Sequence, residues 1–295
     1  MIQLLMIAPA KPVISLIDKS FKQDYSKHFQ LTIRIALDGF SFVIYSPEKQ
    51  RFVGIEHYRF HPLNDKMQLS AMLDEIMMKQ AWIVYPYQQV KVFVDNLKAV
   101  VVPNPLFDEK EKGNYLAFAQ AFQDNSRIVT DPLKTADATL IYYLSNVLAA
   151  KIKDFWANAT IRHLSSAFIE STLVGNKNIQ QDAVVFIHVR NQAFDMLVLA
   201  DQKLRFFNTF RFNTKEDFIY FLLFAMEQQH LNPEKTPIQF SGALEAGSEI
   251  YTICERYIRN IQFEKRNKSF DYSYVLETLP WHQHSLLFNT SQCEL

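Results

Sequence analysis

Glycine is scarce in this sequence. An average composition of roughly 7% would place about twenty glycines in a chain of this length. The 295 residues contain only 6. A loop that wraps closely round a phosphate group relies on glycine, because other residues resist positive φ and their Cβ atoms block close approach. The chain can therefore build few glycine-rich phosphate loops.

Cysteine and long apolar runs are also scarce. The only cysteines are Cys254 and Cys293, which form neither a C-x-x-C pair nor a disulfide framework, and this favours a reducing compartment. The first sixteen residues, MIQLLMIAPAKPVISL, lack the basic start of a signal peptide. The longest apolar run, at 218–226, is far shorter than the ~20 residues that span a bilayer. We therefore expect a cytoplasmic protein without membrane insertion.

Net charge is absent as well. Lys+Arg and Asp+Glu both total 31, and the isoelectric point is about 7.1. This balance gives no reason to expect a nucleic-acid partner, because such proteins carry an excess of basic residues. The hydrophobic content of 48% and the aromatic content of 14% describe a well-packed protein.

One pattern occurs twice in the chain. Residues 40–60 read FSFVIYSPEKQRFVGIEHYRF, and residues 194–212 read FDMLVLADQKLRFFNTFRF. Phe40 aligns with Phe194, and the two copies end in register once the second is given two fewer turn residues. Each copy follows an apolar strand-like run and precedes a helical stretch and another strand. An internal duplication allows the chemistry of each half to be checked against that of the other.

Two domains are predicted from the length, at about 150 residues each. The polar stretch GNKNIQQ, at 175–181, is the best candidate for their boundary. We predict a loosely ordered lead-in segment at 1–29 and a first half at 30–178 that ends in a β-α-β-α block. The second half then occupies 179–295.

Strands and helices alternate along the sequence, which is the pattern of an α/β protein with mixed sheets. Asp38-Gly39 has the signature of a two-residue type I′ hairpin turn, in which both residues adopt positive φ. Helical spacing is expected within 104–125 and again at 269–279, as the last helix of the chain. Thr214 and Asp217 predict a capped start for the helix over 215–230.

Two copies of a β-β-β-α-β-α unit resemble the plan of the actin-like ATPase superfamily. That superfamily includes actin, the heat-shock-70 chaperones, hexokinase-type sugar kinases and the bacterial cell-division and pilus-assembly ATPases. The chain is most similar to a bacterial family of unknown function with this fold. The similarity runs from Asp18 onward and rests on four segments: IALDGFSFVIYS, VVVPNPLFDE, DFIYFLLFAMEQ and RYIRNIQF. It implies a duplicated, ribonuclease H-like α/β fold, nearest in plan to the pilus-assembly and cell-division members.

The resemblance also implies a first phosphate-binding hairpin. In active superfamily members it reads D-x-G-x-[ST], and its aspartate orders Mg²⁺ through water. The matching residues here are Asp38, Gly39 and Ser41, with the spacing one residue short. A tight hairpin turn by itself also explains Asp38-Gly39.

The second phosphate-binding hairpin should again carry an aspartate and glycine. The matching stretch, VRNQAF at 189–194, contains neither. Arg190 and Asn191 are the residues there that would contact a nucleotide. Asp195 aligns with Ser41 and lies beyond the turn, so nothing in this loop is expected to position a metal or an attacking water.

The adenosine-binding motif of the superfamily is a glycine pair after a strand of the second half. Here Ser241 and Gly242 stand in that place and keep one of the two glycines. Glycine is also common at strand-to-helix turns for geometric reasons alone. The candidate nucleotide-contacting residues are therefore Asp38, Gly39, Ser41, Arg190, Asn191, Ser241 and Gly242, and no catalytic residue is assigned.

No metal site is expected. His57 and His61 have a helical metal-ligand spacing but fall in and after a strand, and His282 and His284 have no third ligand near them in sequence. Zinc, P-loop and G-x-S-x-G patterns are absent from the sequence.

Three functions remain open, and we rank them in this order. The first is a non-catalytic scaffold that binds an unidentified protein partner, without a cofactor, and shows an exposed apolar or aromatic patch. The second is a switch that binds ATP with Mg²⁺ but does not hydrolyse it. The third is a small-molecule kinase, which needs a carboxylate such as Asp95 or Asp195 within reach of substrate.

Overall fold

A computed structural model describes residues 11–60, 63, 66–96, 98–177 and 182–292. The chain divides into two compact units. The first unit combines residues 1–95, 144–161 and 270–278, and the second combines 96–143, 162–269 and 279–295. This differs from the predicted division at 178/179. Each unit is built from three separate segments of the chain, so a single boundary in the sequence cannot divide them.

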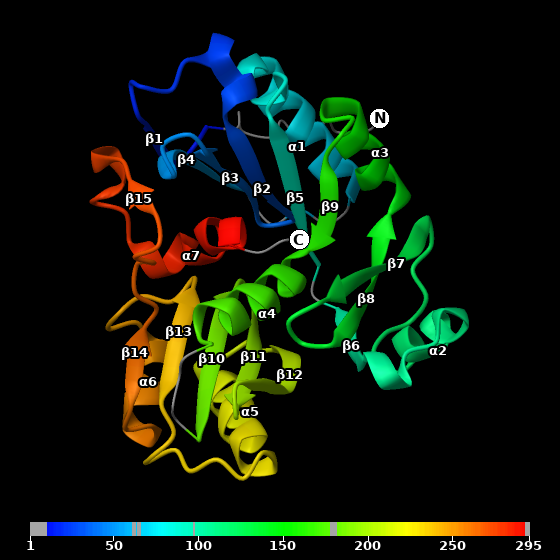
Figure 1. Cartoon of the computed structure of the whole chain (residues 1–295). Helices are drawn as coiled ribbons and strands as arrows, with labels where there is room; N and C mark the ends of the chain where they lie inside the picture. The colour runs from blue at the N-terminus through cyan, green and yellow to red at the C-terminus, as the bar shows by residue number, and fades with distance from the viewer. Residues whose placement is uncertain (1–10, 61–62, 64–65, 97, 178–181, 293–295) are drawn as a thin grey trace, which may run out of the picture. The chain divides into compact units, whose positions relative to one another are not determined.

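The first unit is built on one mixed sheet, coloured mainly blue in Figure 1. Its strand order is β1-β4-β3-β2-β5-β9, and β15 also pairs with β4. Helices α1 and α3 contact each other in this unit. The element bounds are β1 (Ile14–Ile17), β2 (Gln30–Ala36), β3 (Gly39–Ser46), β4 (Arg51–Arg59), α1 (Lys66–Lys79), β5 (Gln89–Asp95), α3 (Asn146–Phe155), β9 (Thr160–His163) and β15 (Asp271–Tyr272).

The predicted lead-in segment belongs to this sheet from residue 14. Strand β1 pairs antiparallel with β4, and a 3-10 helix follows at Gln23–His28. The buried Asp18 carboxylate accepts a hydrogen bond from the Ser273 hydroxyl. This contact and the strand pairing order a segment whose own composition predicts little structure.

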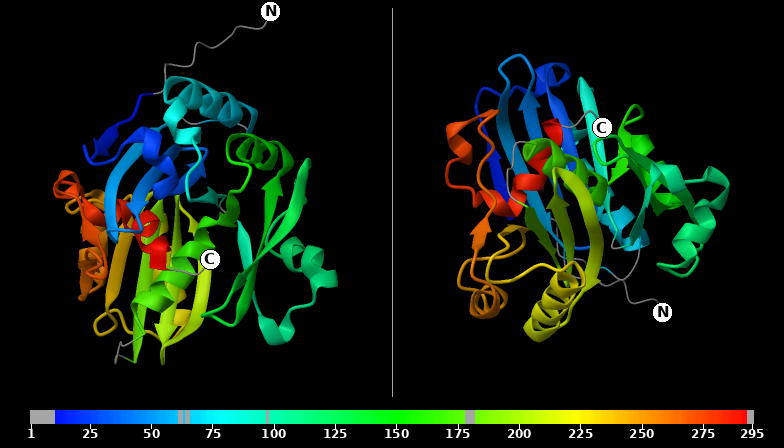
Figure 2. Two further views of the ribbon diagram at one scale, coloured as in Figure 1. Left: turned by 45° about the horizontal axis from the view of Figure 1, so that its top comes forward. Right: turned by 60° about the horizontal axis from the view of Figure 1, so that its bottom comes forward.

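The second unit holds a five-stranded sheet of order β12-β11-β10-β13-β14 and a three-stranded sheet of order β6-β8-β7. Helices α5 and α6 cover the face of the larger sheet opposite to α4 (Figures 1 and 2). The bounds are β6 (Ala99–Pro103), α2 (Lys112–Ala117), β7 (Ser126–Leu133), β8 (Ala138–Ser145), α4 (Leu164–Gly175), β10 (Ala183–Arg190), β11 (Ala193–Ala200), β12 (Lys203–Arg211), α5 (Lys215–Gln228), β13 (Ile238–Gly242), α6 (Glu249–Tyr257), β14 (Ile261–Phe263) and α7 (Trp281–Asn289).

The core of the larger sheet follows from the alternation of its strands. Val185, Ile187 and Val189 of β10 point to the α5 side, where Phe218 of α5 and Cys254 of α6 are fully buried among them. The residues between them on β10, such as Phe186, point to the α4 side. Both faces of β10 and β11 are therefore covered, and both strands are apolar along most of their length.

The internal duplication is confirmed at the level of hydrogen bonds. The Phe60 amide donates to the Asp38 carbonyl at 2.9 Å, and the Phe212 amide donates to the Gln192 carbonyl at 3.1 Å. Both copies also contain a register shift where the second strand pairs with the third, between Ile44 and Tyr45 of β3 in the first half and between Val198 and Leu199 of β11 in the second. The two halves thus share a bulge as well as a strand order.

The turn at the first hairpin differs from the expectation. Strand β3 begins at Gly39, so the two turn residues are Leu37 and Asp38, and neither Asp38 nor Gly39 has positive φ. Glycine is needed at position 39 for another reason, since a Cβ there would lie 2.5 Å from the Tyr58 carbonyl oxygen. The type I′ pattern occurs instead at the β11–β12 turn, where Asp201 and Gln202 both have positive φ.

Two helix predictions also require correction. The helix expected within 104–125 is only α2, and Phe118, which directly follows it, is exposed. The segment 269–279 forms no α-helix, because the amides of Asp271 and Ser273 donate to carbonyls of the β4 region. This strand-like pairing overrides the local helical pattern, and the last helix is α7. The capped start of α5 at Thr214 is confirmed.

Gly242 offers a direct test of close backbone packing. It has φ of +83°, and a Cβ there would lie 2.1 Å from the Val189 carbonyl oxygen. Gly247 has nearly the same φ, +80°, but open space around it. We expect Gly242→Ala to lower the free energy of unfolding by roughly 3 kcal/mol or more, and the matched control Gly247→Ala by only about 1 kcal/mol. Urea denaturation measures both, and equal losses would contradict the packing argument.

Candidate functional site

The first hairpin contains an arginine held by two carboxylates. The Arg34 guanidinium donates to Asp38 at 3.0 Å through Nη2 and to Asp95 at 2.9 Å through Nε. Asp38 lies in the turn, and Asp95 ends β5, with its side chain 3% exposed. Burial opposes the charge on Arg34, but Asp95 and then Asp38 outweigh it and raise the pKa of the guanidinium. Asp38 is therefore one partner in a three-residue ion-pair cluster.

Ser41 of the same hairpin lies beside a neutral histidine. Its hydroxyl is 3.3 Å from Nδ1 of His57 on β4, and Ser41 is buried. Burial lowers the pKa of His57 to about 4, with Arg34 and Arg59 adding to the effect and Asp38 opposing it. His57 is therefore uncharged at neutral pH, and His61, which lies four residues further along the sequence, is outside the described residues.

The second hairpin contains a single buried ion pair. The Arg190 guanidinium donates to Asp195, and the two side chains are 3% and 0% exposed. Asp195 also accepts from Thr209 Oγ1 at 2.5 Å and from Ser165 Oγ at 3.2 Å. Asn191 is an exposed turn residue that takes no part in this cluster. The Arg190 guanidinium therefore forms its ion pair with a carboxylate of its own unit.

Ser241 and Gly242 end β13, directly beside the end of β10. Ser241 pairs with His188 in the sheet register, and its hydroxyl lies 3.0 Å from His188 Nδ1. Gly242 brings the chain against Val189, whose carbonyl accepts from the next amide at 2.8 Å. Helix α6 starts only at Glu249, and the Ser248 hydroxyl caps it. The glycine therefore shapes a loop of several residues before the helix begins.

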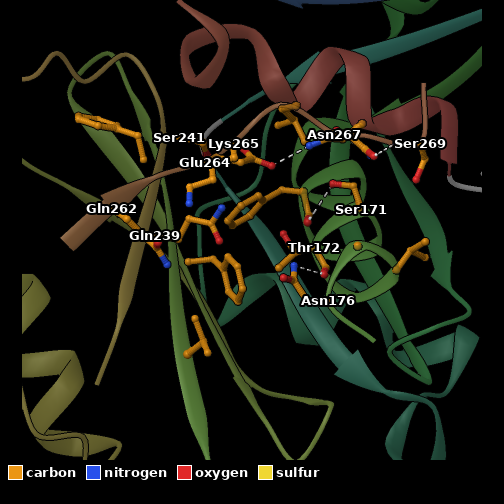
Figure 3. Close-up of a pocket in the computed structure, with 18 residues that line it drawn as sticks. Ser171, Thr172, Asn176, Gln239, Ser241, Gln262, Glu264, Lys265, Asn267 and Ser269 are labelled. Carbon is orange, nitrogen blue, oxygen red and sulfur yellow. Dashed lines mark hydrogen bonds between the residues drawn. The ribbon is translucent and has the colours of Figure 1, made fainter. Parts of the chain in front are cut away.

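A cavity of about 720 Å³ lies in the second unit, on the α4 side of the larger sheet (Figure 3). Its lining is rich in hydroxyl and carboxamide groups, with Ser171 from α4, Asn176 directly after α4, Gln239 from β13 and Gln262 from β14. Gln239 and Gln262 are register partners on adjacent parallel strands. Of the residues proposed from the sequence, Ser241 lines this cavity.

Glu264 is the acidic group of the cavity. It accepts from the Ser285 hydroxyl and from Asn289 Nδ2 at 2.7 Å. Burial raises the pKa of its carboxyl to about 7, although the two hydrogen bonds act in the opposite direction. Glu264 therefore changes charge near neutral pH. Sequence reasoning missed it because Ser285 and Asn289 lie on α7, which the pattern had placed too early.

The structure thus groups the proposed residues by unit. Asp38, Gly39 and Ser41 share the β2–β3 hairpin of the first unit. Arg190, Asn191, Ser241 and Gly242 lie in the second unit, at the neighbouring ends of β10 and β13. The residues that neutralise their charges, Arg34 and Asp195, were not singled out as partners. Both residues lie on strands of the two hairpins, so predicting the strand register would have placed them near the residues that they neutralise.

A family model described as "Protein of unknown function (DUF3822)" matches residues 18–261. The chain belongs to this family. A comparison with curated proteins gives no match.

Among solved structures, the fold resembles a Bacteroides thetaiotaomicron protein with an actin-like ATPase fold and unknown function. The TM-score is 0.74 at 20% sequence identity, over 83% of this chain and 93% of that one. A PilM–PilN type IV pilus biogenesis complex also matches, with a TM-score of 0.55 at 8% identity, over 89% of this chain and 96% of that chain. These similarities establish that this DUF3822 protein has the actin-like ATPase fold, as the resemblance implied.

Two further observations bear on the class of protein. Among the residues that the structure covers, no group of three or more His, Cys, Asp or Glu side chains is arranged to hold a metal ion. In the same part of the DUF3822 chain, none of the helices has the length and apolar character needed to cross a bilayer.

The buried ion pair of the second hairpin is testable by stability measurements. We expect Arg190→Met to lower the free energy of unfolding by about 3–5 kcal/mol, because it leaves the Asp195 carboxylate buried without a cation. The double variant Arg190→Met/Asp195→Asn removes that charge and should recover most of the loss. Urea denaturation gives all three values. A loss below ~1 kcal/mol in the single variant would mean that Asp195 is not held as a buried anion.

The raised pKa of Glu264 predicts a pH-dependent stability. In the folded state its carboxyl binds a proton up to about pH 7, whereas the ordinary pKa of a glutamic acid side chain is 4.5. Its contribution is therefore complete below about pH 4.5 and is lost as the pH rises through 7. Glu264→Gln should gain roughly 1–3 kcal/mol relative to the natural chain between pH 5 and pH 8. The control is Glu277→Gln, outside the cavity, which should show no such pH trend in thermal melts.

Proposed function

We propose that this protein acts by binding another protein and that it neither hydrolyses ATP nor transfers its γ-phosphate. The observation that carries the proposal is the neutralisation of hairpin carboxylates by arginines. Asp38 and Asp95 are held by Arg34, and Asp195 is held by Arg190.

A magnesium nucleotide demands a different arrangement. Mg²⁺ takes oxygen ligands from carboxylates, phosphates and water, and phosphoryl transfer depends on positioned charges around the metal and the attacking group. The Asp38 carboxylate already accepts a hydrogen bond from the Arg34 guanidinium, and the second turn, Asn191-Gln192, has no carboxylate. The residues at the two hairpins therefore do not fit a hydrolytic Mg-ATP site.

A kinase is disfavoured by burial. A catalytic base must reach the hydroxyl of its substrate to accept a proton. The side chains of Asp95 and Asp195 are 3% and 0% exposed, and each is bonded to an arginine of the same unit. Neither carboxylate is placed to contact a substrate.

Protein binding is supported by exposed aromatic side chains. Tyr220 and Phe224, one turn apart on α5, are 62% and 46% exposed and stack with ring centroids 6.2 Å apart. Exposed aromatic groups are typical of interfaces, because they bury a large apolar area when a partner covers them. One of the structures with this fold is a PilM–PilN complex, and this supports the proposal of a protein-binding role.

Calorimetry with Mg-ATP tests the proposal. We expect no saturable heat and no thermal stabilisation at millimolar ATP, because a site that binds ATP at 1,000 times below that concentration would stabilise the fold by about 4 kcal/mol. The natural chain is compared with Asp38→Ala. Micromolar binding that disappears in this variant would contradict the proposal and favour the ATP-dependent switch.

A further inference from the structure

The outer edge of β12 differs from the same edge in the first unit. By the alignment of the hairpins, β12 corresponds to β4, so Thr209 occupies the place of His57 and Phe207 the place of Ile55. In the first unit β4 is covered by β1 and by β15. Within the described ranges, β12 has no strand on its outer side.

The backbone groups along this edge can be assigned. The Phe212 amide bonds inward to Gln192, and antiparallel pairing alternates, so residues 206, 208 and 210 also bond inward to β11. The amides and carbonyls of Phe207, Thr209 and Arg211 therefore point outward, where the Thr209 amide donates to the neighbouring Asn208 Oδ1 at 2.9 Å. In the first unit the equivalent outward carbonyl, that of His57, accepts from the Val13 amide at 2.8 Å.

The chain itself shows how such an edge is filled. Strand β1 has the sequence Ile-Ser-Leu-Ile and runs antiparallel to β4, with Ile14 opposite His57 and Ile17 opposite Gly54. Because both halves share the same register and the same bulge, a segment with this geometry fits against Phe206–Thr209 of β12. Unpaired edges of this kind bind extended segments through main-chain hydrogen bonds.

Charge distinguishes the possible occupants. Strand β12 carries the exposed basic residues Lys203, Arg205 and Arg211 and has no acidic residue. A second copy of the chain that paired along the whole strand would be centred on Phe207 and would place Lys203 opposite Arg211. Like charges directly opposite one another on adjacent strands destabilise the pair. A self-associated edge is therefore disfavoured.

We propose that the outer edge of β12 binds an extended segment of a partner protein, antiparallel to β12, with apolar residues at its centre and acidic residues at its ends. This inference rests on the proposed protein-binding function and gives it a location. Main-chain groups of Phe207, Thr209 and Arg211 supply the hydrogen bonds, and the Thr209 amide exchanges its bond to Asn208 Oδ1 for one to the segment. Lys203 and Arg211 select the acidic ends.

The test uses two nine-residue peptides and the full-length chain. Both have Ile-Ser-Leu-Ile at the centre, and one has glutamate at each end where the other has lysine. We expect the glutamate peptide to bind about fivefold to tenfold more tightly, from two favourable cross-strand charge pairs. It should slow hydrogen exchange at the amides of Phe207, Thr209 and Arg211 and leave those of Phe206, Asn208 and Phe210 unchanged.

Three variants sharpen the test. Arg211→Pro removes one outward amide, a change that edge strands tolerate, and should abolish peptide binding while the thermal melt stays intact. Lys203→Glu/Arg211→Glu should reverse the preference in favour of the lysine peptide. Lys235→Glu, an exposed lysine outside β12, is the matched control and should leave the preference unchanged.

Equal affinity for both peptides, or no protection of the three outward amides at millimolar peptide, would overturn the inference. Concentration-dependent dimerisation that protects the same amides would assign the edge to a second copy and also overturn it. Neither outcome bears on Mg-ATP, so the proposed function stands or falls separately in the calorimetric test.

Discussion

A single backbone hydrogen bond sets the geometry of each half. The amide of Phe60 or Phe212 bonds to the carbonyl at the second turn residue, Asp38 or Gln192, and thereby fixes the strand register. Register decides which side chains share a face, because a slip of one residue moves every side chain to the other side of the sheet. The ion-pair partners, the core positions and the outward backbone groups of the third strand all follow from it.

The shared register also explains why the two halves neutralise their charges differently. In the first half the arginine lies inside β2 and reaches Asp38 in the turn and Asp95 on the neighbouring strand. In the second half the arginine ends β10 and reaches Asp195 inside β11. Each solution pairs a buried carboxylate with a guanidinium, which is required once the carboxylate is removed from water. A carboxylate that is paired in this way is poorly available as a ligand for a metal ion.

Much of the fold was predictable from the sequence, and the duplicated hairpin is the clearest case. Apolar alternation located β2–β5 and β10–β13, and the alignment of Ser41 with Asp195 matches the structure. The errors arose where distant contacts override local pattern. Residues 271–273 pair with the β4 region, and β1 gains its order from the same strand. The role of Glu264 in the cavity was missed for the same reason, since its hydrogen-bond donors, Ser285 and Asn289, lie on α7.

The outer edges of the two sheets differ, although the hairpins that form them are duplicated. Both third strands inherit the same bulge and the same outward carbonyls, so the unsatisfied edge is a property of the repeat itself. The first half satisfies its edge with segments from opposite ends of the sequence, β1 and β15. In the second half the described chain supplies no such segment, and the strand carries Lys203, Arg205 and Arg211 instead. Exposed charges are a common means of preventing uncontrolled pairing at an edge, and they also restrict which strand is admitted. The basic residues of β12 therefore combine protection of the edge with a preference for an acidic partner.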